Sequence, residues 1–404
     1  MDLNACMQFL EQNQQKMLDL TIKLAEINSG SLNISGINTI SGIMQQELMQ
    51  LQCEHVAMPV APYQQINQFG ETLEYPLGKV QRFWKRPNAP MQVLILGHLD
   101  TVYSADHKFK LTKKIGGDIL HGPGVADMKG GLVILLWALK AFEHLPQATQ
   151  LGWEVLLNAD EEIGSPGSAE IIAYRAKMHQ AGFIFEPAMD ENGTLASNRK
   201  GSGTFTLVLR GLSAHAGRNF HEGRNAICKM AEAVTKINAL NGIREGVTIN
   251  VGFIHGGEAV NVVPDCCVCK INVRLPHLAD ATWVSEQFNS IVQSINTTDY
   301  KLELHGGFHR QPKEMDPKTE RLYNIVQDVG AKLGQKISWQ ASGGSSDGNN
   351  LSAVGLPNVD TLGVRGGKIH SPQEFMLIPS LVERAKLFTN ILVYLSENGL
   401  KHGT

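Results

Sequence analysis

Met91-Gln-Val-Leu-Ile-Leu-Gly-His-Leu-Asp100 is the stretch of sequence that decides the fold. Its apolar run ends at Gly97, which is the pattern of a strand buried on both faces of a sheet. Similar runs occupy 152–158 and 183–185, and an apolar helix is predicted over 132–142. Because strands alternate with helices here, the sequence predicts an α/β domain with a mainly parallel central sheet and helices on both faces.

The pattern of apolar residues changes near residue 200. Strands are predicted over 203–210, 247–251, 266–274 and 301–305, and helices over 222–240 and 281–295. These elements predict a small α+β domain of the ferredoxin-like type over 201–310, inserted into a larger domain formed by 1–200 and 311–404. Further helices of the larger domain are expected over 6–28, 36–53, 317–333 and 379–395.

The composition is that of a soluble globular protein. The chain has 404 residues, of which 43% are hydrophobic and 19% charged, and its net charge is -3. This near-neutral balance argues against a general nucleic-acid or membrane-surface binder. Residues 1–20 have an amphipathic pattern without the basic start of a signal peptide, and no run of about 18 apolar residues occurs. We therefore expect a cytoplasmic protein without a membrane span.

Three of the six cysteines lie in one strand-like run, at Cys266, Cys267 and Cys269. Alternation along a strand places Cys267 and Cys269 on one face and Cys266 on the other. We expect buried, reduced thiols that behave as small apolar side chains, with a metal or disulfide role as the alternative.

Polar residues follow the predicted strands. His98 and Asp100 are two residues apart, so an extended chain places both side chains on one face. This suits His98 as a metal ligand and Asp100 as the carboxylate that accepts a hydrogen bond from its second ring nitrogen. Glu186 follows the run at 183–185, where a charged side chain needs a partner. A core histidine beside a turn aspartate, and a surface turn at Glu186, are the alternatives.

Two further segments carry carboxylates. Asp127 follows a glycine-rich loop at the start of the predicted helix, and an N-cap is its alternative role. Because Lys129 is not followed by Ser or Thr, the loop lacks the spacing of a phosphate-binding loop. Asp160, Glu161 and Glu162 are adjacent and repel one another unless cations compensate. We interpret this triplet as a metal ligand beside a proton carrier, with a solvated acidic loop as the alternative.

Together these segments place one histidine and several carboxylates at successive strand ends of one sheet, where open α/β sheets bind their ligands. Zinc accepts such nitrogen and oxygen ligands, and two zinc ions need a bridging carboxylate. A second histidine, His370, follows an apolar and glycine-rich stretch far along the chain. The sequence therefore favours a metal centre at this edge of the sheet.

Over essentially its whole length the chain resembles the dinuclear-zinc metallopeptidase family that contains glutamate carboxypeptidases, acetylornithine deacetylases, succinyl-diaminopimelate desuccinylases and aminoacylases. Six motifs occur in the order of that family. They are GHLDTV at 97–102, GPGVADMKGG at 122–131, NADEEIGSPGS at 158–168, FEPA at 185–188, GLSAHAG at 211–217 and GKIHSPQE at 367–374.

The resemblance implies two zinc ions per chain, for which cobalt or manganese could substitute. It assigns one zinc to His98, Asp127 and Glu186. It assigns the other zinc to Asp127, Glu162 and His370, so that Asp127 bridges the two ions. The larger domain is then expected to have a zinc-peptidase-like fold.

The same resemblance implies the catalytic roles. Asp100 supports the first histidine ligand, Glu161 is the general base and acid, and the peptide bond Asp127–Met128 is cis. The inserted domain is implied to be a lid and dimerisation domain, so we expect a homodimer. Within that domain His215 donates a hydrogen bond to the oxyanion, often in the active site of the partner subunit. A turn histidine with local partners is the alternative for His215.

The substrate-binding residues implied by the resemblance are Asn261, Arg274 and the loop that contains Gly343 and Gly344. Arg274 suits the bidentate capture of a carboxylate, and backbone N–H groups of the glycine loop can bind an anion. Lys200, at the boundary between the two predicted domains, is a further candidate. Residues 218–222 depart from the Pro-Glu pattern that is familiar after this family's HAG motif, which bears on the choice of substrate.

We therefore expect a glutamate-carboxypeptidase-like enzyme that releases a C-terminal amino acid, acidic or other, from a peptidyl or N-acyl amide. The alternative is an N-acyl-amino-acid deacylase of the acetylornithine deacetylase or succinyl-diaminopimelate desuccinylase type. A non-catalytic binding protein on the same fold would lack a ligand or the base, whereas every family position is filled here. A phosphate-loop nucleotide enzyme is disfavoured by the glycine after Lys129.

Overall fold

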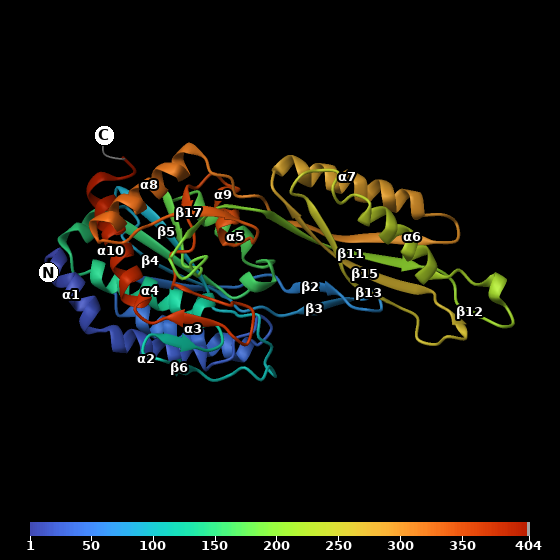
Figure 1. Cartoon of the computed structure of the whole chain (residues 1–404), viewed down its shortest axis with the longest axis horizontal. Coiled ribbons are helices and arrows are strands. Elements are labelled where there is room, and N and C mark those ends of the chain that lie inside the picture. Colours follow the sequence, from blue (N-terminus) through green and yellow to red (C-terminus); the bar gives the residue numbers. More distant parts are fainter. Residues whose placement is uncertain (402–404) are drawn as a thin grey trace.

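The computed structural model describes residues 1–401 and contains two lobes (Figure 1). The larger lobe is built on a six-stranded sheet and the smaller lobe on a four-stranded sheet. The chain enters the smaller lobe along β11 (Gly201–Arg210) and returns along β16 (Lys301–Arg310). Within residues 1–401 no helix is both long and apolar enough to cross a membrane.

The six-stranded sheet confirms the predicted α/β fold with a mainly parallel sheet. Its order is β1 (Glu54–Met58), β4 (Val80–Lys85), β8 (Leu151–Asn158), β5 (Met91–His98), β9 (Ala181–Ile184) and β18 (Asn358–Val359). Strands β8, β5, β9 and β18 are parallel, whereas β4 is antiparallel to β8 and β1 is antiparallel to β4. Strands β1 and β4 are not among the strands predicted from the sequence, because polar residues interrupt their apolar pattern.

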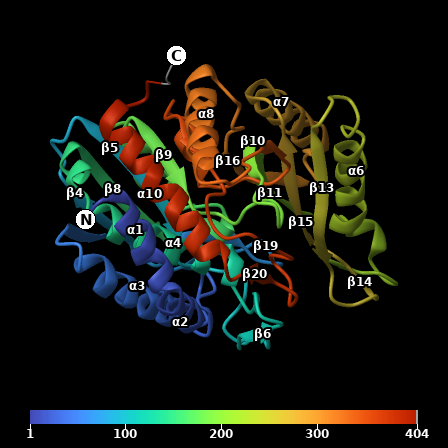
Figure 2. The same ribbon diagram turned by 60° about the vertical axis from the view of Figure 1, so that its left-hand side comes forward.

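Helices cover both faces of this sheet, as predicted. Successive strand residues point to opposite faces, so Ile95 of β5 packs in one core and Leu96 in another. Figure 2 shows α10 lying across one face of the sheet beside α4. The first core contains residues of α1 (Leu3–Gln12), α2 (Gln14–Ala25), α3 (Ile34–Met49), α4 (Gly130–Phe142), α8 (Pro317–Lys332) and α10 (Ser380–Asn398). The second core contains residues of α5 (Ala169–Ala176) and α9 (Asp347–Ser352).

Two helices begin or break at residues other than those predicted. The helix expected over 6–28 is broken at Asn13, whose side-chain amide donates to the carbonyl four residues earlier, at 2.8 Å. The helix expected over 222–240 begins only after Asn225, whose side chain caps the first turn. Residues Phe220–Glu222 form a separate 3₁₀ turn. In both cases an asparagine side chain competes with the helical backbone for hydrogen bonds.

The smaller lobe has the ferredoxin-like arrangement. Its antiparallel sheet has the order β13 (Thr248–Gly256), β15 (Cys266–Leu275), β11 and β16. Helices α6 (Ala226–Asn238) and α7 (Leu278–Ile295) pack with this sheet in a core of their own. Cys267 and Cys269 are buried in that core as free thiols, and Cys266 on the other face is half-buried. This agrees with the alternation read from the sequence.

A hairpin of β2 (Tyr63–Ile66) and β3 (Thr72–Tyr75) reaches from the larger lobe to the smaller one (Figure 1). At its tip the carbonyl of Gly70 accepts a hydrogen bond from Arg210 at 2.9 Å. Gly70 has φ +74° and an added Cβ would lie 2.6 Å from the side chain of Val208, so this approach requires glycine. The hairpin is not predicted, because its two strands are only four residues long and neither contains a continuous apolar run.

The remaining strands are short. A small sheet contains β19 (Gly366–Gly367), β20 (Phe375–Leu377), β7 (Ile119–His121) and β6 (Lys113–Ile115). Two pairs complete the described chain, β10 (Leu195–Arg199) with β17 (Trp339–Ser342) and β12 (Ala214–His215) with β14 (Val262–Val263).

Candidate active site

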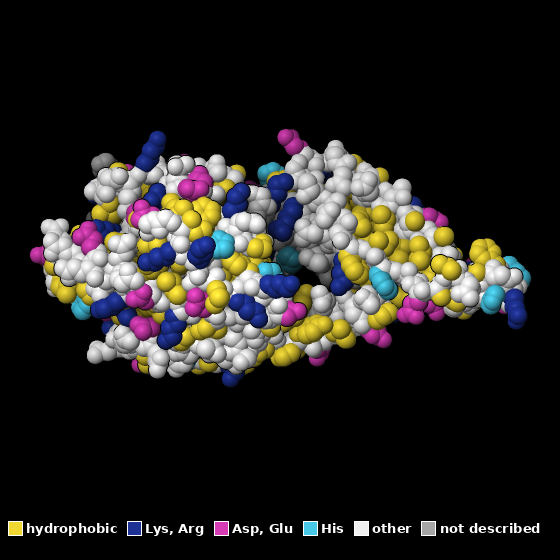
Figure 3. All heavy atoms as spheres, turned by 60° about the horizontal axis from the view of Figure 1, so that its bottom comes forward, with side chains coloured by type: hydrophobic (Ala, Val, Ile, Leu, Met, Phe, Trp, Pro, Cys, Tyr) yellow, Lys and Arg dark blue, Asp and Glu magenta, His cyan; other side chains and the backbone are white. Residues whose placement is uncertain are grey.

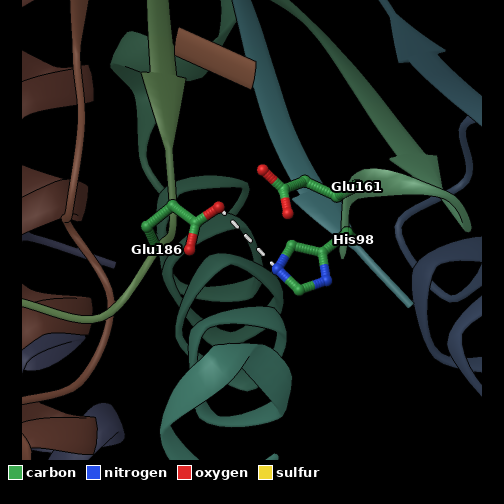
Figure 4. Close-up of side chains that lie close together, drawn as sticks. All are labelled: His98, Glu161 and Glu186. Atoms are coloured by element: carbon green, nitrogen blue, oxygen red, sulfur yellow. Dashed lines mark ion pairs between the residues drawn. The ribbon is translucent and has the colours of Figure 1, made fainter. Parts of the chain in front are cut away.

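The acidic and histidine residues singled out from the sequence meet at the carboxyl edge of the parallel strands. His98 ends β5, the two glutamates Glu161 and Glu162 follow β8, and Glu186 follows β9. Figure 4 shows the carboxylates of Glu161 and Glu186 directed toward the imidazole of His98. All four residues therefore project from successive strand ends, as expected for a ligand site in an open α/β sheet.

Asp127 lies between the two histidines. Its Oδ1 atom is 3.1 Å from Nε2 of His98, and its Oδ2 atom is 3.1 Å from Nε2 of His370. Glu186 Oε1 lies 3.7 Å from the first of these nitrogens, and Glu162 Oε2 lies 3.3 Å from the second. The five side chains thus form two groups of potential ligands that share one aspartate. The peptide bond Asp127–Met128 is cis.

The donor set fits two divalent cations. It offers two imidazole nitrogens and three carboxylates, which are ligands that zinc accepts. The ligand atoms of His98, Asp127 and Glu162 all lie within 4.8 Å of one another. The Oε1 atom of Glu162 is buried and has no hydrogen-bond partner, so it retains full capacity to bind a cation.

Charge is concentrated in this group of side chains. Burial, reinforced by the charge of Asp127, raises the pKa of Glu162 to about 7. Burial likewise raises the pKa of Glu186. Hydrogen bonds to Asp127 and Glu162 raise the pKa of His370 to about 11. The carboxylates therefore need positive charge close by, which protonated histidines or bound cations supply.

Asp100 forms hydrogen bonds with several groups of the site. Its two carboxylate oxygens accept hydrogen bonds from the backbone N–H groups of Glu161, at 3.2 Å, and Glu162, at 3.1 Å. The hydroxyl of Ser31 also donates to it, at 2.7 Å. The Nδ1 atom of His98 is 3.0 Å from the backbone carbonyl of Asp100 and 3.4 Å from its carboxylate. Asp100 therefore orients the histidine ring mainly through its backbone, and the acidic turn through its side chain.

Glu161 has a partner that is not among the residues predicted from the sequence. The guanidinium of Arg310, at the end of β16, lies 2.7 Å from its carboxylate, and both side chains are buried. Arg310 also donates to Ser165 at 3.0 Å and lies 3.5 Å from Asp347. Burial raises the pKa of Glu161 well above its usual value, and the charge of Arg310 opposes that rise.

A cavity of about 330 Å³ opens beside these residues and is lined by Glu161, Glu186 and the loop from Gly344 to Ser345. Arg274 and Arg310 both donate to the hydroxyl of Ser345, at 3.1 and 3.4 Å. Figure 3 shows the surface hollowed between the two lobes, with Lys and Arg side chains around the hollow. Two guanidinium groups thus converge on the predicted glycine loop, close to the acidic cluster.

The other predicted substrate residues differ in position. Gly344 lines the cavity, whereas Gly343 lines a neighbouring cavity of about 400 Å³ together with Lys200. The ammonium of Lys200 donates to the carbonyl of Gly246 at 2.6 Å and is directed to the smaller lobe. The preceding residue, Arg199, lines the active-site cavity in its place, where it pairs with buried Asp360 at 2.6 Å.

His215 and Asn261 lie together but far from the acidic cluster of their own chain. Figure 1 places β12, which ends at His215, at the outer tip of the smaller lobe. The Nδ1 atom of His215 accepts hydrogen bonds from two backbone N–H groups, those of Gly217 and Arg218. The carbonyl of Asn261 accepts from Ala216 at 2.9 Å. Both side chains are exposed at this tip.

Comparisons with known proteins agree with this geometry. A family model described as peptidase family M20/M25/M40 matches residues 94–394. Carboxypeptidase G2 of Pseudomonas sp. (strain RS-16) is 24% identical over 398 residues, which cover 96% of this chain and 92% of that protein. Succinyl-diaminopimelate desuccinylase of Hahella chejuensis is 26% identical over 344 residues, which cover 80% of this chain and 87% of that protein. The crystal structure of a tripeptidase from Staphylococcus aureus superposes with a TM-score of 0.74 at 23% identity, over 96% of this chain and 99% of that one.

Proposed function

The chain belongs to peptidase family M20/M25/M40 and is a metallohydrolase, and we propose that it acts as a dinuclear-zinc carboxypeptidase that releases a C-terminal acidic amino acid. Enzymes of this family are metal-dependent and typically hold two metal ions. The observation that carries the proposal is the position of Asp127, whose two oxygens each lie 3.1 Å from a different histidine. A carboxylate placed in this way suits a bridge between two cations.

In this proposal His98, Asp127 and Glu186 hold one zinc, and Asp127, Glu162 and His370 hold the other. Bound zinc supplies a water of lowered pKa and polarises the carbonyl of the scissile amide. Cobalt or manganese could occupy the same ligands, because such sites rarely exclude them by affinity alone.

Glu161 is proposed to move the proton. Its carboxylate is buried, and one of its oxygens lies within 4.8 Å of the ligand atoms of His98 and Glu186. Glu161 is nevertheless assigned to no zinc, because each ion already has three other protein ligands. It accepts the proton of the attacking water and delivers it to the leaving nitrogen. Burial favours its protonated form, which suits a group that must hold a proton between the two transfers. Asp100 keeps Glu161 in place through the hydrogen bond to its backbone N–H.

Arg274 and Arg310 are proposed to bind the C-terminal carboxylate of the substrate. Both guanidinium groups approach Ser345, and the Nε atom of Arg310 is buried without a hydrogen-bond partner. A carboxylate placed between them would satisfy that donor and gain charge-assisted hydrogen bonds. Selection for a free C-terminus follows, because an amidated substrate would leave the guanidinium of Arg274 without a carboxylate partner, whereas Arg310 already pairs with Glu161.

The smaller lobe is proposed to form a homodimer that completes the active site. His215 and Asn261 are exposed and distant from the acidic cluster of their own chain. Large apolar side chains are exposed near them, including Phe220 at 65% and Val260 at 106% of full exposure, as is common where a partner binds. In the dimer the partner's His215 donates a hydrogen bond to the oxyanion, either directly or after the lobes close.

The second candidate function is an N-acyl-amino-acid deacylase, which the similarity to the desuccinylase over 80% of the chain favours. The metals and Glu161 serve either reaction, so the test is a comparison of substrates. We expect zinc-loaded protein to have a higher kcat/KM on N-acyl-glutamates and glutamate-ending dipeptides than on N-acetylornithine or N-succinyl-diaminopimelate. The reverse order would favour the deacylase, and no hydrolysis of any of them would reject both.

A further inference from the structure

Glu374 is a carboxylate buried beneath the candidate metal site, with 1% of its surface exposed. One of its oxygens accepts hydrogen bonds from the backbone N–H groups of Ala126, at 2.9 Å, and Asp127, at 3.0 Å. The other oxygen accepts from the N–H of Gly124, at 3.0 Å, and from the hydroxyl of Tyr103, at 2.8 Å. This single side chain therefore fixes the backbone that carries Asp127.

The same hydrogen bonds reach the second histidine. The single O–H of Tyr103 is shared between Glu374 and the carbonyl of Ser371, the residue after His370, which lies 2.9 Å from the hydroxyl oxygen. The same carbonyl also accepts from the backbone N–H of Glu374 at 3.1 Å. His370 is the most exposed of the proposed ligands, with 51% of its side chain accessible, and it has φ +60°. A ligand on such a loop has few packing contacts to hold it, so its position depends on tethers of this kind.

The chemistry of Glu374 is specific to a carboxylate. All its hydrogen-bond donors are neutral, two on each oxygen, and no Lys, Arg or His side chain within residues 1–401 forms an ion pair with it. Glutamine has the same shape but one amide group in place of an oxygen. That group would face N–H donors on whichever side it occupied, and would leave them buried and unpaired.

We infer that Glu374 is a positioning residue that sets the direction of both Asp127 oxygens and, through Tyr103, tethers the loop of His370. The inference rests on the proposed dinuclear site. Its consequence is that the relative placement of the two proposed metals is controlled by a residue that binds neither. Loss of partners that orient metal ligands typically weakens metal affinity by about 10–100-fold.

The main test compares full-length wild type with Glu374→Gln. Metal affinity is measured by competition of Zn²⁺ with a chelator, and the visible spectrum of the Co²⁺-loaded protein reports ligand geometry. We expect an affinity about 10–100-fold lower, an altered Co²⁺ spectrum, and a kcat that recovers toward wild type at saturating metal. Unchanged affinity with an unchanged spectrum would overturn the inference.

Glu143→Gln is the matched control. Glu143 is also a largely buried glutamate with several partners, namely Lys85, Arg86 and Trp153, and it takes no part in the ligand cluster. Both variants lose stability in the metal-free protein, but only Glu374→Gln should lose metal affinity. Equal losses of affinity in the two variants would mean that general destabilisation, and not positioning, is the cause, and would overturn the inference.

Two further variants test whether Glu374 acts on metal affinity through Tyr103 and through Asp127. Tyr103→Phe keeps the ring but removes the hydroxyl that contacts Ser371, so it should lower the affinity for the metal bound by His370 more than the affinity for the other metal. This variant also tests the inference if Glu374→Gln does not fold. In an Asp127→Asn background Glu374→Gln should add a smaller loss than it causes in the wild type, because only the route through Tyr103 remains. Additive losses would contradict action through Asp127. If the wild type bound no metal, the proposed function would fail; two metals held equally well by both proteins would reject only the role of Glu374.

Discussion

The guanidinium of Arg310 lies 2.7 Å from the carboxylate of Glu161, and so joins the last residue of β16 to the acidic turn after β8. These residues are 149 positions apart, and Arg310 also donates to the backbone carbonyl of Glu161. The boundary between the two lobes is thereby attached directly to the proposed general base. A movement of the smaller lobe would displace Arg310 and so change the contacts of Glu161. Closure of the hollow between the lobes is thereby linked to catalysis.

Arg310→Gln should move the acidic limb of the pH profile of kcat/KM to higher pH. The charge of Arg310 lowers the pKa of Glu161 against the effect of burial, so its removal raises that pKa. The base is then protonated, and inactive, at a pH where the wild type still works. Arg175→Gln is the control, because Arg175 pairs with the buried Glu154 outside the active site. A pH profile that stays in place in Arg310→Gln would show that this ion pair does not tune the base.

Glu161→Gln and Glu162→Gln should differ in the number of metal ions that they retain. Glu161→Gln keeps its metals and its fold but loses turnover by a factor on the order of 10² to 10⁴, as for a lost general base. Glu162→Gln loses one of the metals, because its Oε2 atom lies 3.3 Å from the second histidine within the ligand cluster. Metal analysis of both proteins after dialysis, together with kcat, checks this division. Equal metal content in the two variants would contradict it.

Arg274→Ala should weaken selection for a free C-terminal carboxylate. A hydrogen bond to a charged group contributes about 1.5–3 kcal/mol, so kcat/KM on a glutamate-ending dipeptide should fall by about 10–100-fold. Its C-terminal amide, a poor substrate for the wild type, should be hydrolysed at an unchanged rate. Lys200→Ala is the control, because that ammonium is bound to the carbonyl of Gly246. An equal loss on both substrates would assign Arg274 to structure and not to recognition.

His215→Ala should reduce turnover and leave metal content unchanged. A mixture of inactive Glu161→Gln chains with inactive His215→Ala chains tests whether the histidine acts between subunits. A mixed dimer contains one site that pairs an intact Glu161 with the intact His215 of the partner subunit, so activity should return. No recovery, in mixed dimers verified by two affinity tags, would mean that His215 acts within its own chain or not at all.

The sequence is most informative where local pattern and function coincide. His98, Glu161 and Glu186 could be predicted because each follows a buried strand, and a polar residue at such a point has few structural reasons to be there. Asp127 precedes an apolar helix and could be placed beside them by the same topology. The grouping of His370 with these residues depends on the family resemblance, since the residue lies 243 positions from Asp127 in the chain.

Residues that act through long-range contacts carry no local signal. Arg310 is an arginine at the end of an amphipathic strand, and nothing in its neighbours distinguishes it from a surface arginine. Arg199 could not be separated from Lys200 by sequence, although only Arg199 lines the active-site cavity. The hairpin at 63–75 could not be predicted from local periodicity, because contacts with Arg210 and Cys266 of the smaller lobe help to hold its tip. These features depend on how the two lobes are placed, which local periodicity does not encode.

Asp127 is proposed to bridge two metal ions, and the metal content of the purified chain, compared with its amidase activity, decides whether two ions are bound and needed. We predict two zinc ions per chain, loss of activity on dialysis against a chelator, and its return when two equivalents of Zn²⁺ are added back. Asp127→Asn should bind neither ion tightly. Full hydrolytic activity in protein shown to contain no divalent metal would contradict the account.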